Sequence, residues 1–149
     1  MGLFFNQPTR HFQLREISRI INLGLPSVIN YVKILEKEKL IKKIETGIYP
    51  SYCANITDRF KLYKRNDMLL KIIESGLIDC IYERFIPDAI ILFGSASKGE
   101  DIESSDIDLF VMAREEDVNL TSFEKKLSRK INLFFEEKLK DVPKELLNN

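Results

Sequence analysis

Two short apolar runs separated by a polar loop mark the second half of the chain. The first, Ala89–Phe93, is rich in β-branched and bulky residues and ends at Gly94. This is typical of a buried strand, although periodicity alone does not exclude a short helix. The second run, Asp106–Met112, alternates apolar and polar residues, which predicts a strand with Asp106 and Asp108 on one face. We therefore expect two neighbouring strands, one of which carries a pair of carboxylates.

Helical periodicity prevails in the N-terminal part of the chain. Residues 10–24 carry apolar side chains at helical spacing up to Gly24, and Pro26 opens a second helix directly afterwards. Residues 40–54 read as a β-hairpin that turns at Gly47. Two short helices joined through a glycine turn and followed by a hairpin predict a winged helix-turn-helix. Leu14, Ile17 and Ile21 have helical spacing in the first helix, and the expected core face of the second helix is Val28, Val32 and Leu35.

A long helical pattern over residues 57–84 connects this part to the two strands. Gly76 is expected to interrupt the helix, and Pro87 is expected to end it. After the strands, residues 117–128 predict a further helix and residues 131–135 a third strand. We expect the apolar stripe of the long helix to face a core. Its members are Phe60, Tyr63, Met68, Leu69, Ile72, Ile73, Leu77, Ile78, Ile81, Tyr82 and Phe85, and Phe123 and Leu127 line the inner face of the later helix.

The predicted fold class is α+β with two domains. Residues 1–56 form the winged helix-turn-helix, and residues 57–149 form linker helices and a small mixed sheet packed with helices. A last helix, expected to open at Pro143, stops two apolar residues before the final asparagines. This predicts that the natural chain extends past Asn149.

Charge divides the chain in the same way as the pattern does. The net charge is zero, but residues 1–65 hold 12 Lys and Arg against 5 Asp and Glu, whereas residues 66–149 hold 11 against 18. The basic part is therefore the candidate for nucleic acid. No apolar run is long enough for a membrane span, and the N-terminal apolar stretch is too short for a signal peptide. Cys53 and Cys80 lie far apart without a CxxC motif, which predicts free thiols and a cytoplasmic protein.

The outward face expected for the second N-terminal helix carries side chains that can bond phosphates and base edges in the major groove. An ordinary solvated helix face is the alternative, and the hairpin that follows favours DNA, because its lysines can contact phosphate. This region resembles the recognition helix and wing of archaeal and bacterial winged-helix regulators, which are commonly dimers. The candidate DNA-binding residues are Ser27, Asn30, Lys33 and Lys37 on the helix and Lys42 and Lys43 on the wing.

Candidate chemistry lies in the loop between the two strands. Gly94 directly after the first strand lets backbone N–H groups approach an anion, and the Ser95 hydroxyl adds a donor. Asp106 and Asp108 repel each other unless a cation lies between them. A D-x-D pair alone is more often a solvated strand edge, but a phosphate-binding turn on the neighbouring strand favours a nucleotide–Mg²⁺ site.

Gly94 and Ser95, ten intervening residues, and Asp106 and Asp108 together resemble the signature of the DNA polymerase β-like nucleotidyltransferases, especially the minimal ones. The resemblance implies that Gly94 and Ser95 bind the triphosphate of ATP or another NTP. It implies that Asp106 and Asp108 hold Mg²⁺ or Mn²⁺ and act in catalysis. Lys98 stands where the family commonly has an arginine, which makes it a further nucleotide-binding candidate.

The family uses a third carboxylate from a later strand, and here the expected position holds Asn132. Glu136 and Glu137 at the end of that strand are alternatives. Two functions stay open. The first, slightly favoured because the glycine–serine turn and the acid pair are intact, is transfer of a nucleotidyl group to a hydroxyl acceptor. The second is a DNA-binding regulator or antitoxin whose weak or inactive domain senses nucleotide or a partner.

The resemblance implies a protein acceptor as one option, because family members paired with HEPN-type RNase toxins act as antitoxins in that way. The sequence does not define the acceptor, the NTP, the DNA sequence or the oligomeric state.

Overall fold

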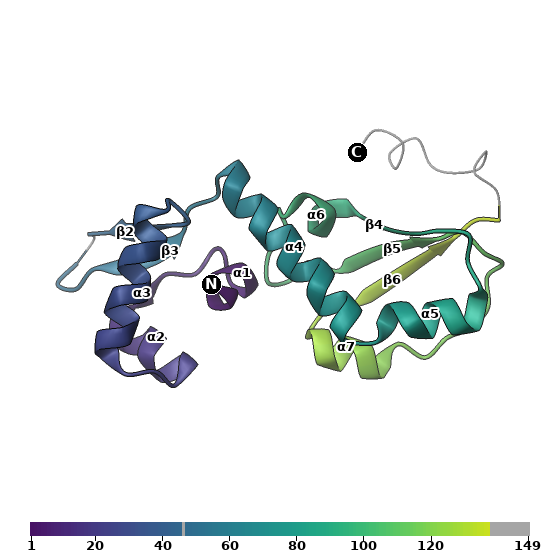
Figure 1. The fold of residues 1–149 in the computed structure, drawn as a ribbon, viewed down its shortest axis with the longest axis horizontal. Helices are drawn as coiled ribbons and strands as arrows, with labels where there is room; N and C mark the ends of the chain where they lie inside the picture. The colour runs from purple at the N-terminus through teal and green to yellow at the C-terminus, as the bar shows by residue number, and fades with distance from the viewer. Residues whose placement is uncertain (46, 138–149) are drawn as a thin grey trace. The chain divides into compact units, whose positions relative to one another are not determined.

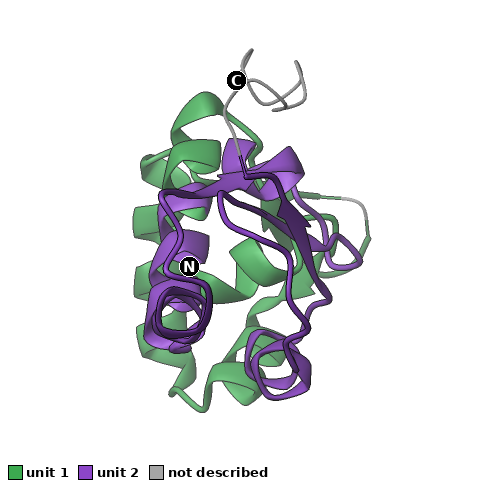
Figure 2. Cartoon of the chain, turned by 90° about the vertical axis from the view of Figure 1, so that its right-hand side faces the viewer, with its two compact units in different colours: residues 1–64 green, residues 65–149 purple. Residues whose placement is uncertain are grey.

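The computed structural model describes residues 1–45 and 47–137, so the last helix expected from Pro143 lies outside the described residues. The fold is α+β, as the sequence predicts (Figure 1). The chain forms two compact units, residues 1–64 and residues 65–149 (Figure 2). Helix α4 (Asp58–Glu74) begins in the first unit and ends in the second.

The first unit combines short helices with a small antiparallel sheet. Strand β3 lies in the middle of this sheet, between β1 and β2. The predicted helix pair and hairpin are present, with α2 and α3 joined by a short turn and β2 joined to β3 by the loop that contains Gly47. In chain order the elements are α1 (Gly2–Asn6), β1 (Phe12–Gln13), α2 (Leu14–Ile21), α3 (Leu25–Lys37), β2 (Ile41–Ile44) and β3 (Ser51–Ala54).

The start of the first predicted helix is wrong, because residues 12 and 13 form strand β1 instead. Phe12 is fully buried and pairs with Tyr52 of β3. Helix α2 begins only after Gln13, whose side chain and backbone form a capping box with Glu16. Residues 12 and 13 therefore pair with β3, which buries the Phe12 ring, and the capping box fixes the start of α2.

The core of the first unit contains most of the expected positions. Ile17, Val28 and Val32 are buried, and Leu14 and Leu35 pack against the core. Ile21 is 41% exposed, because α2 ends at that residue with a left-handed turn at Asn22. The core is completed by aromatic residues from both ends of the unit, namely Phe4, Phe5, Phe12 and Phe60.

The second unit contains the three predicted strands in one mixed sheet. The central strand β5 pairs antiparallel with β4 and parallel with β6. The long helical pattern is broken at Gly76, as expected, and the backbone there has a φ of +82°. Besides α4, the elements are α5 (Leu77–Phe85), β4 (Ile90–Phe93), α6 (Gly94–Lys98), β5 (Ile107–Val111), α7 (Thr121–Leu127) and β6 (Ile131–Phe135).

Two predictions for this unit need correction. The apolar stripe of the long helix is narrower than expected, because helices α4 and α5 bury positions such as Met68 and Ile81, while Tyr63, Ile73 and Tyr82 are exposed. The helix predicted over residues 117–128 begins only at Thr121. The side chain of Asn119 accepts a hydrogen bond from the Thr121 N–H at 3.0 Å, so the residues before it form a turn.

The sheet of the second unit has one face packed on helices. Side chains of this face, among them Leu109 and Val111, share a core with residues of α4, α5 and α7. Alternation along the strands places Asp108 and Asn132 on the other face, where Phe93 is their neighbour in register. None of the described helices is long and apolar enough to span a membrane. Cys53 and Cys80 are free thiols.

Candidate functional site

Pairing of the three strands brings the two aspartates and Asn132 together. Asp108 is in register with Asn132 on β6, and Asp106 immediately precedes β5. The Asn132 side-chain nitrogen donates to Asp108 Oδ1 at 2.9 Å and to Asp106 Oδ2 at 3.3 Å. One amide group therefore joins both carboxylates in a single cluster, which we call the acid pair with its bridging amide.

Gly94 lies directly against this cluster. It opens α6 with a φ of +68°, and a Cβ atom built on it would lie 2.6 Å from Asp108 Oδ2. Glycine is therefore needed here both for the backbone conformation and for the close approach of the carboxylate. Ser95 follows in half-buried surroundings, and its hydroxyl makes no hydrogen bond to any other described residue. Lys98 is exposed at the end of α6.

Gly94→Ala is expected to destabilise the protein by about 1–2 kcal/mol through the left-handed backbone and to displace the Asp108 carboxylate. Mg²⁺-dependent nucleotide binding should therefore be lost. Chemical denaturation and titration calorimetry measure the two effects.

Gly76→Ala is the matched control for this substitution. Gly76 also has a positive φ, of +82°, but a Cβ atom there would meet nothing within 4 Å. This control should lose similar stability and keep binding. Equal nucleotide affinity in the two variants would contradict a role for the contact between Gly94 and Asp108.

A buried ion pair supports the loop that leads into the acid pair. Arg129 Nη2 lies 2.9 Å from Asp101 Oδ2, with both side chains almost fully buried. The same guanidinium donates through Nη1 to the Ser105 carbonyl at 3.1 Å. Arg129 thus ties the segment just before Asp106 to the turn between α7 and β6. Sequence reasoning missed this ion pair, because no local pattern of residues predicts it.

The alternative third acids, Glu136 and Glu137, lie at the wrong end of strand β6. Glu136 donates its N–H to the carbonyl of Val111, which is the last residue of β5 and lies at the opposite end of the strand from Asp106. It follows Asn132 by four residues, or roughly 13 Å along an extended strand. Asn132 is therefore the candidate for the third position whose side chain contacts both aspartates, and its role there stays a prediction of the family resemblance.

The donor set of this cluster fits one divalent cation. Carboxylate oxygens are the ligands that Mg²⁺ and Mn²⁺ prefer. Within residues 1–45 and 47–137 no group of three or more His, Cys, Asp or Glu side chains is placed to hold a metal ion, so the set consists of two carboxylates and one amide. The Asn132 nitrogen now lies where both carboxylates can reach it, and a half-turn of the amide would present its oxygen there instead.

The six candidate DNA-binding residues of the first unit are all exposed. The structure adds exposed apolar side chains to the same helix, because Tyr31 and Ile34 of α3 are also largely accessible. At strand β2, Lys43 Nζ lies 2.6 Å from Glu45 Oε1, and this hydrogen-bonded pair raises the pKa of Lys43 and lowers that of Glu45. The exposed set comprises Ser27, Asn30, Lys33, Lys37, Lys42 and Lys43.

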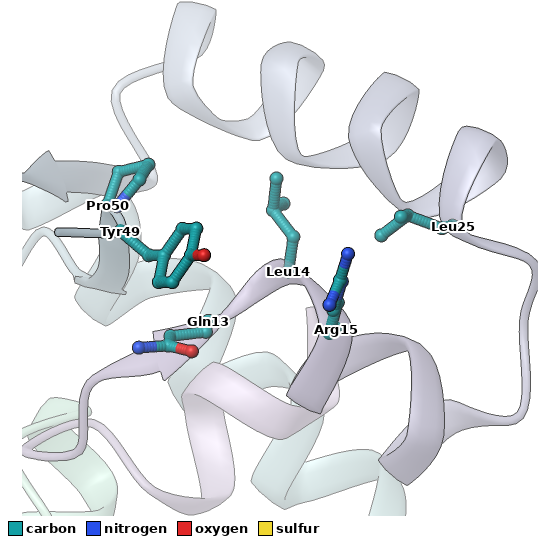
Figure 3. A pocket seen from close by; sticks show the side chains of 6 residues that line it. All are labelled: Gln13, Leu14, Arg15, Leu25, Tyr49 and Pro50. Atoms are coloured by element: carbon teal, nitrogen blue, oxygen red, sulfur yellow. The ribbon is translucent and has the colours of Figure 1, made fainter.

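A pocket of about 250 Å³ lies where the hairpin meets the beginnings of α2 and α3 (Figure 3). Leu14 and Leu25 come from the two helices, and Tyr49 and Pro50 come from the loop before β3. Arg15 adds a charged side chain to this lining. The pocket belongs to the first unit and contains none of the residues around the acid pair.

The architecture of the second unit defines its class, which is that of a small nucleotidyltransferase-type domain. Residues 76–147 match the family described as Polymerase beta, Nucleotidyltransferase, so this part of the chain is similar to that family. The match includes the glycine–serine turn, the acid pair and Asn132. No curated protein and no solved structure shows significant similarity to the chain.

Proposed function

We propose that this protein transfers a nucleotidyl group from a nucleoside triphosphate to a hydroxyl acceptor. The observation that supports this most is the contact of the Asn132 amide with both carboxylates, beside a glycine that the Asp108 carboxylate approaches too closely for any Cβ atom. A solvated strand edge has no need for either feature. All of these residues lie inside the segment that matches the nucleotidyltransferase family.

Each side chain has a defined role in this proposal. Asp106 and Asp108 hold Mg²⁺ or Mn²⁺, which when bound stabilises negative charge on phosphate oxygens. Gly94 and Ser95 bind the triphosphate through backbone N–H groups and a hydroxyl that is free among the described residues. Lys98 adds positive charge from the end of α6. ATP is the simplest substrate to test.

A labelling experiment tests transfer directly. With Mg²⁺ and ATP labelled at the α-phosphorus, we expect label to appear on the protein itself or on an added partner. ATP labelled at the γ-phosphorus should leave no label, because nucleotidyl transfer releases the two outer phosphates as pyrophosphate. Label from the γ-position alone would show a kinase-type reaction and contradict the proposal.

The second candidate function is DNA-dependent regulation, with the nucleotidyltransferase domain as a sensor. The order α2, α3, β2, β3 is that of a helix-turn-helix with a wing, which we propose for residues 1–56. The basic excess of residues 1–65, with 12 Lys and Arg against 5 Asp and Glu, favours duplex DNA as its partner. The two functions are compatible in a cytoplasmic, dimeric antitoxin that modifies a protein hydroxyl, for example on a HEPN-type toxin.

The wing lysines are expected to contribute unequally to DNA binding. Lys43 is paired with Glu45, whereas Lys42 has no ion pair among the described residues. Lys42→Ala should therefore weaken DNA binding more than Lys43→Ala does. Each loss should be the same for all DNA sequences, because the contact is to phosphate, and Glu45→Gln should strengthen DNA binding. Fluorescence titration of labelled duplex DNA over a range of salt concentrations measures these changes. No binding at low salt would argue that the first unit contacts protein instead.

A further inference from the structure

The sheet face that carries the acid pair also carries an aromatic surface. Alternation along the strands places Ile91 and Phe93 of β4, Phe110 of β5 and Phe134 of β6 on the same face as Asp108. Ile91 is 41% exposed and Phe134 is 49% exposed. Phe110 is buried, with 1% of its surface exposed, but none of the four side chains belongs to the core that the helices cover. An accessible aromatic ring beside two carboxylates calls for an explanation in terms of a ligand.

Phe134 is placed next to the acid pair by the register of the strands. It follows Asn132 by two residues on β6, so the two side chains are same-face neighbours about 7 Å apart. Its ring meets that of Phe93 edge to face, with centroids 5.2 Å apart and an interplanar angle of 71°. Phe93 in turn is in register with Asp108. The Phe134 ring is therefore held in a defined orientation while much of it faces solvent.

The groups on this face follow one another in a fixed order. Gly94 and Ser95 come after the end of β4, beyond the residue in register with Asp108. Phe134 is in register with Phe110, on the opposite side of Asp108 along β5. The carboxylates thus lie between the phosphate-binding turn and the aromatic ring. A nucleoside triphosphate has the same order of groups, with outer phosphates at one end, the α-phosphate in between and a planar base at the other end.

We infer that Phe134 is the platform on which the base of the bound nucleoside triphosphate stacks. This inference rests on the proposed function, because it takes the phosphates to lie at Gly94 and the metal at the acid pair. A phenyl ring stacks on any base and offers no hydrogen bond to its edge. The site therefore accepts all four bases, with purines bound more tightly than pyrimidines because their stacking area is larger.

The chain contains no tryptophan, so a single substitution supplies a specific optical probe. Phe134→Trp should show quenched fluorescence on addition of MgATP, and no change with Mg²⁺ and tripolyphosphate, which lacks a base. Tyr82→Trp is the matched control, since Tyr82 is 59% exposed on α5 of the same unit, outside the site. Its fluorescence should not respond to either ligand.

Affinities measured by calorimetry on the full chain complete the test. Phe134→Ala should bind MgATP about tenfold more weakly than the parent, while its affinity for Mg²⁺–tripolyphosphate stays unchanged. Phe134→Tyr should bind MgATP like the parent. Circular dichroism verifies that each variant is folded.

The outcomes separate this inference from the function on which it rests. If the parent binds MgATP and Phe134→Ala binds it equally well, the base lies elsewhere and the stacking role is overturned, although the phosphate and metal site stands. If Phe134→Ala loses affinity for MgATP and for tripolyphosphate alike, the ring acts on the metal site and the inference is also overturned. If the parent binds neither ligand, the proposed function itself is wrong.

Discussion

Asp106→Asn and Asp108→Asn are each expected to weaken Mg²⁺-dependent ATP binding by at least about 100-fold. Loss of a residue that only orients a metal ligand typically costs 10- to 100-fold in metal affinity, so loss of the charge on a direct ligand should cost more. Asparagine has the shape of aspartate, and its side-chain oxygen can still accept the hydrogen bond from the Asn132 amide. The free energy of unfolding without metal should hold or rise slightly, because one of two like charges is removed.

Calorimetric titration of ATP in Mg²⁺ and in EDTA measures this effect. Asp79→Asn is the matched control, because it removes an exposed carboxylate from α5 of the same unit. It should bind ATP like the parent. Unchanged affinity in both Asp106→Asn and Asp108→Asn would show that the acid pair does not hold the metal.

Asn132→Asp is expected to accelerate nucleotidyl transfer at least about tenfold when the acceptor is present. The substitution places a third carboxylate where the amide now contacts both aspartates. With three acids the site should bind a second Mg²⁺ or Mn²⁺ that the parent binds poorly. Without metal the same change replaces two hydrogen bonds by charge repulsion. The metal-free variant should therefore be less stable by about 1–3 kcal/mol, and Mg²⁺ should restore that loss.

Asn132→Ala separates the gain of an acid from the loss of the amide. This variant loses the same hydrogen bonds and adds no ligand, so its transfer rate should not rise and Mg²⁺ should not restore its stability. Transfer of label from ATP measures the rate, and thermal unfolding with and without Mg²⁺ measures the stability. If Asn132→Asp is destabilised in both conditions and gains no activity, the amide has a structural role only.

The parts of the fold that sequence predicts well are those with a strong local pattern. Alternation over residues 106–112 and the apolar run over residues 89–93 predict neighbouring strands, and the pairing of β4 with β5 confirms it. A positive φ at Gly76 explains why the long helix breaks there. Such features depend on a few consecutive residues, so they can be read without knowing what packs against them.

Features that depend on distant partners were not predictable in this way. Strand β1 is only two residues long and exists because Phe12 pairs with Tyr52. The contact of Arg129 with Asp101 likewise joins two segments without a common pattern. Exposure of Tyr82 depends on which side of α5 the sheet covers. In each case the deciding energy comes from tertiary packing and overrides the local preference.

The candidate site shows the same division. The family resemblance, together with the predicted third strand, was enough to place Asn132 beside the two aspartates. The spacing of residues in the sequence does not show where side chains meet. It therefore could not predict the two hydrogen bonds of the Asn132 amide or the close approach of Asp108 to Gly94. The exposed ring of Phe134 was also hidden in a sequence run that reads simply as a strand.

Line broadening by Mn²⁺ in the amide NMR spectrum tests most directly whether the acid pair is a metal site. We predict that substoichiometric Mn²⁺ broadens the backbone amides of Gly94, Asp108 and Asn132 first, together with the side-chain amide of Asn132, and that Asp108→Asn removes this effect. The acidic run of residues 115–117 is the internal control. It carries negative charge, but its side chains do not come together around a point where they could hold a metal ion. Broadening that begins in this run while the Gly94 signal stays sharp would contradict the account.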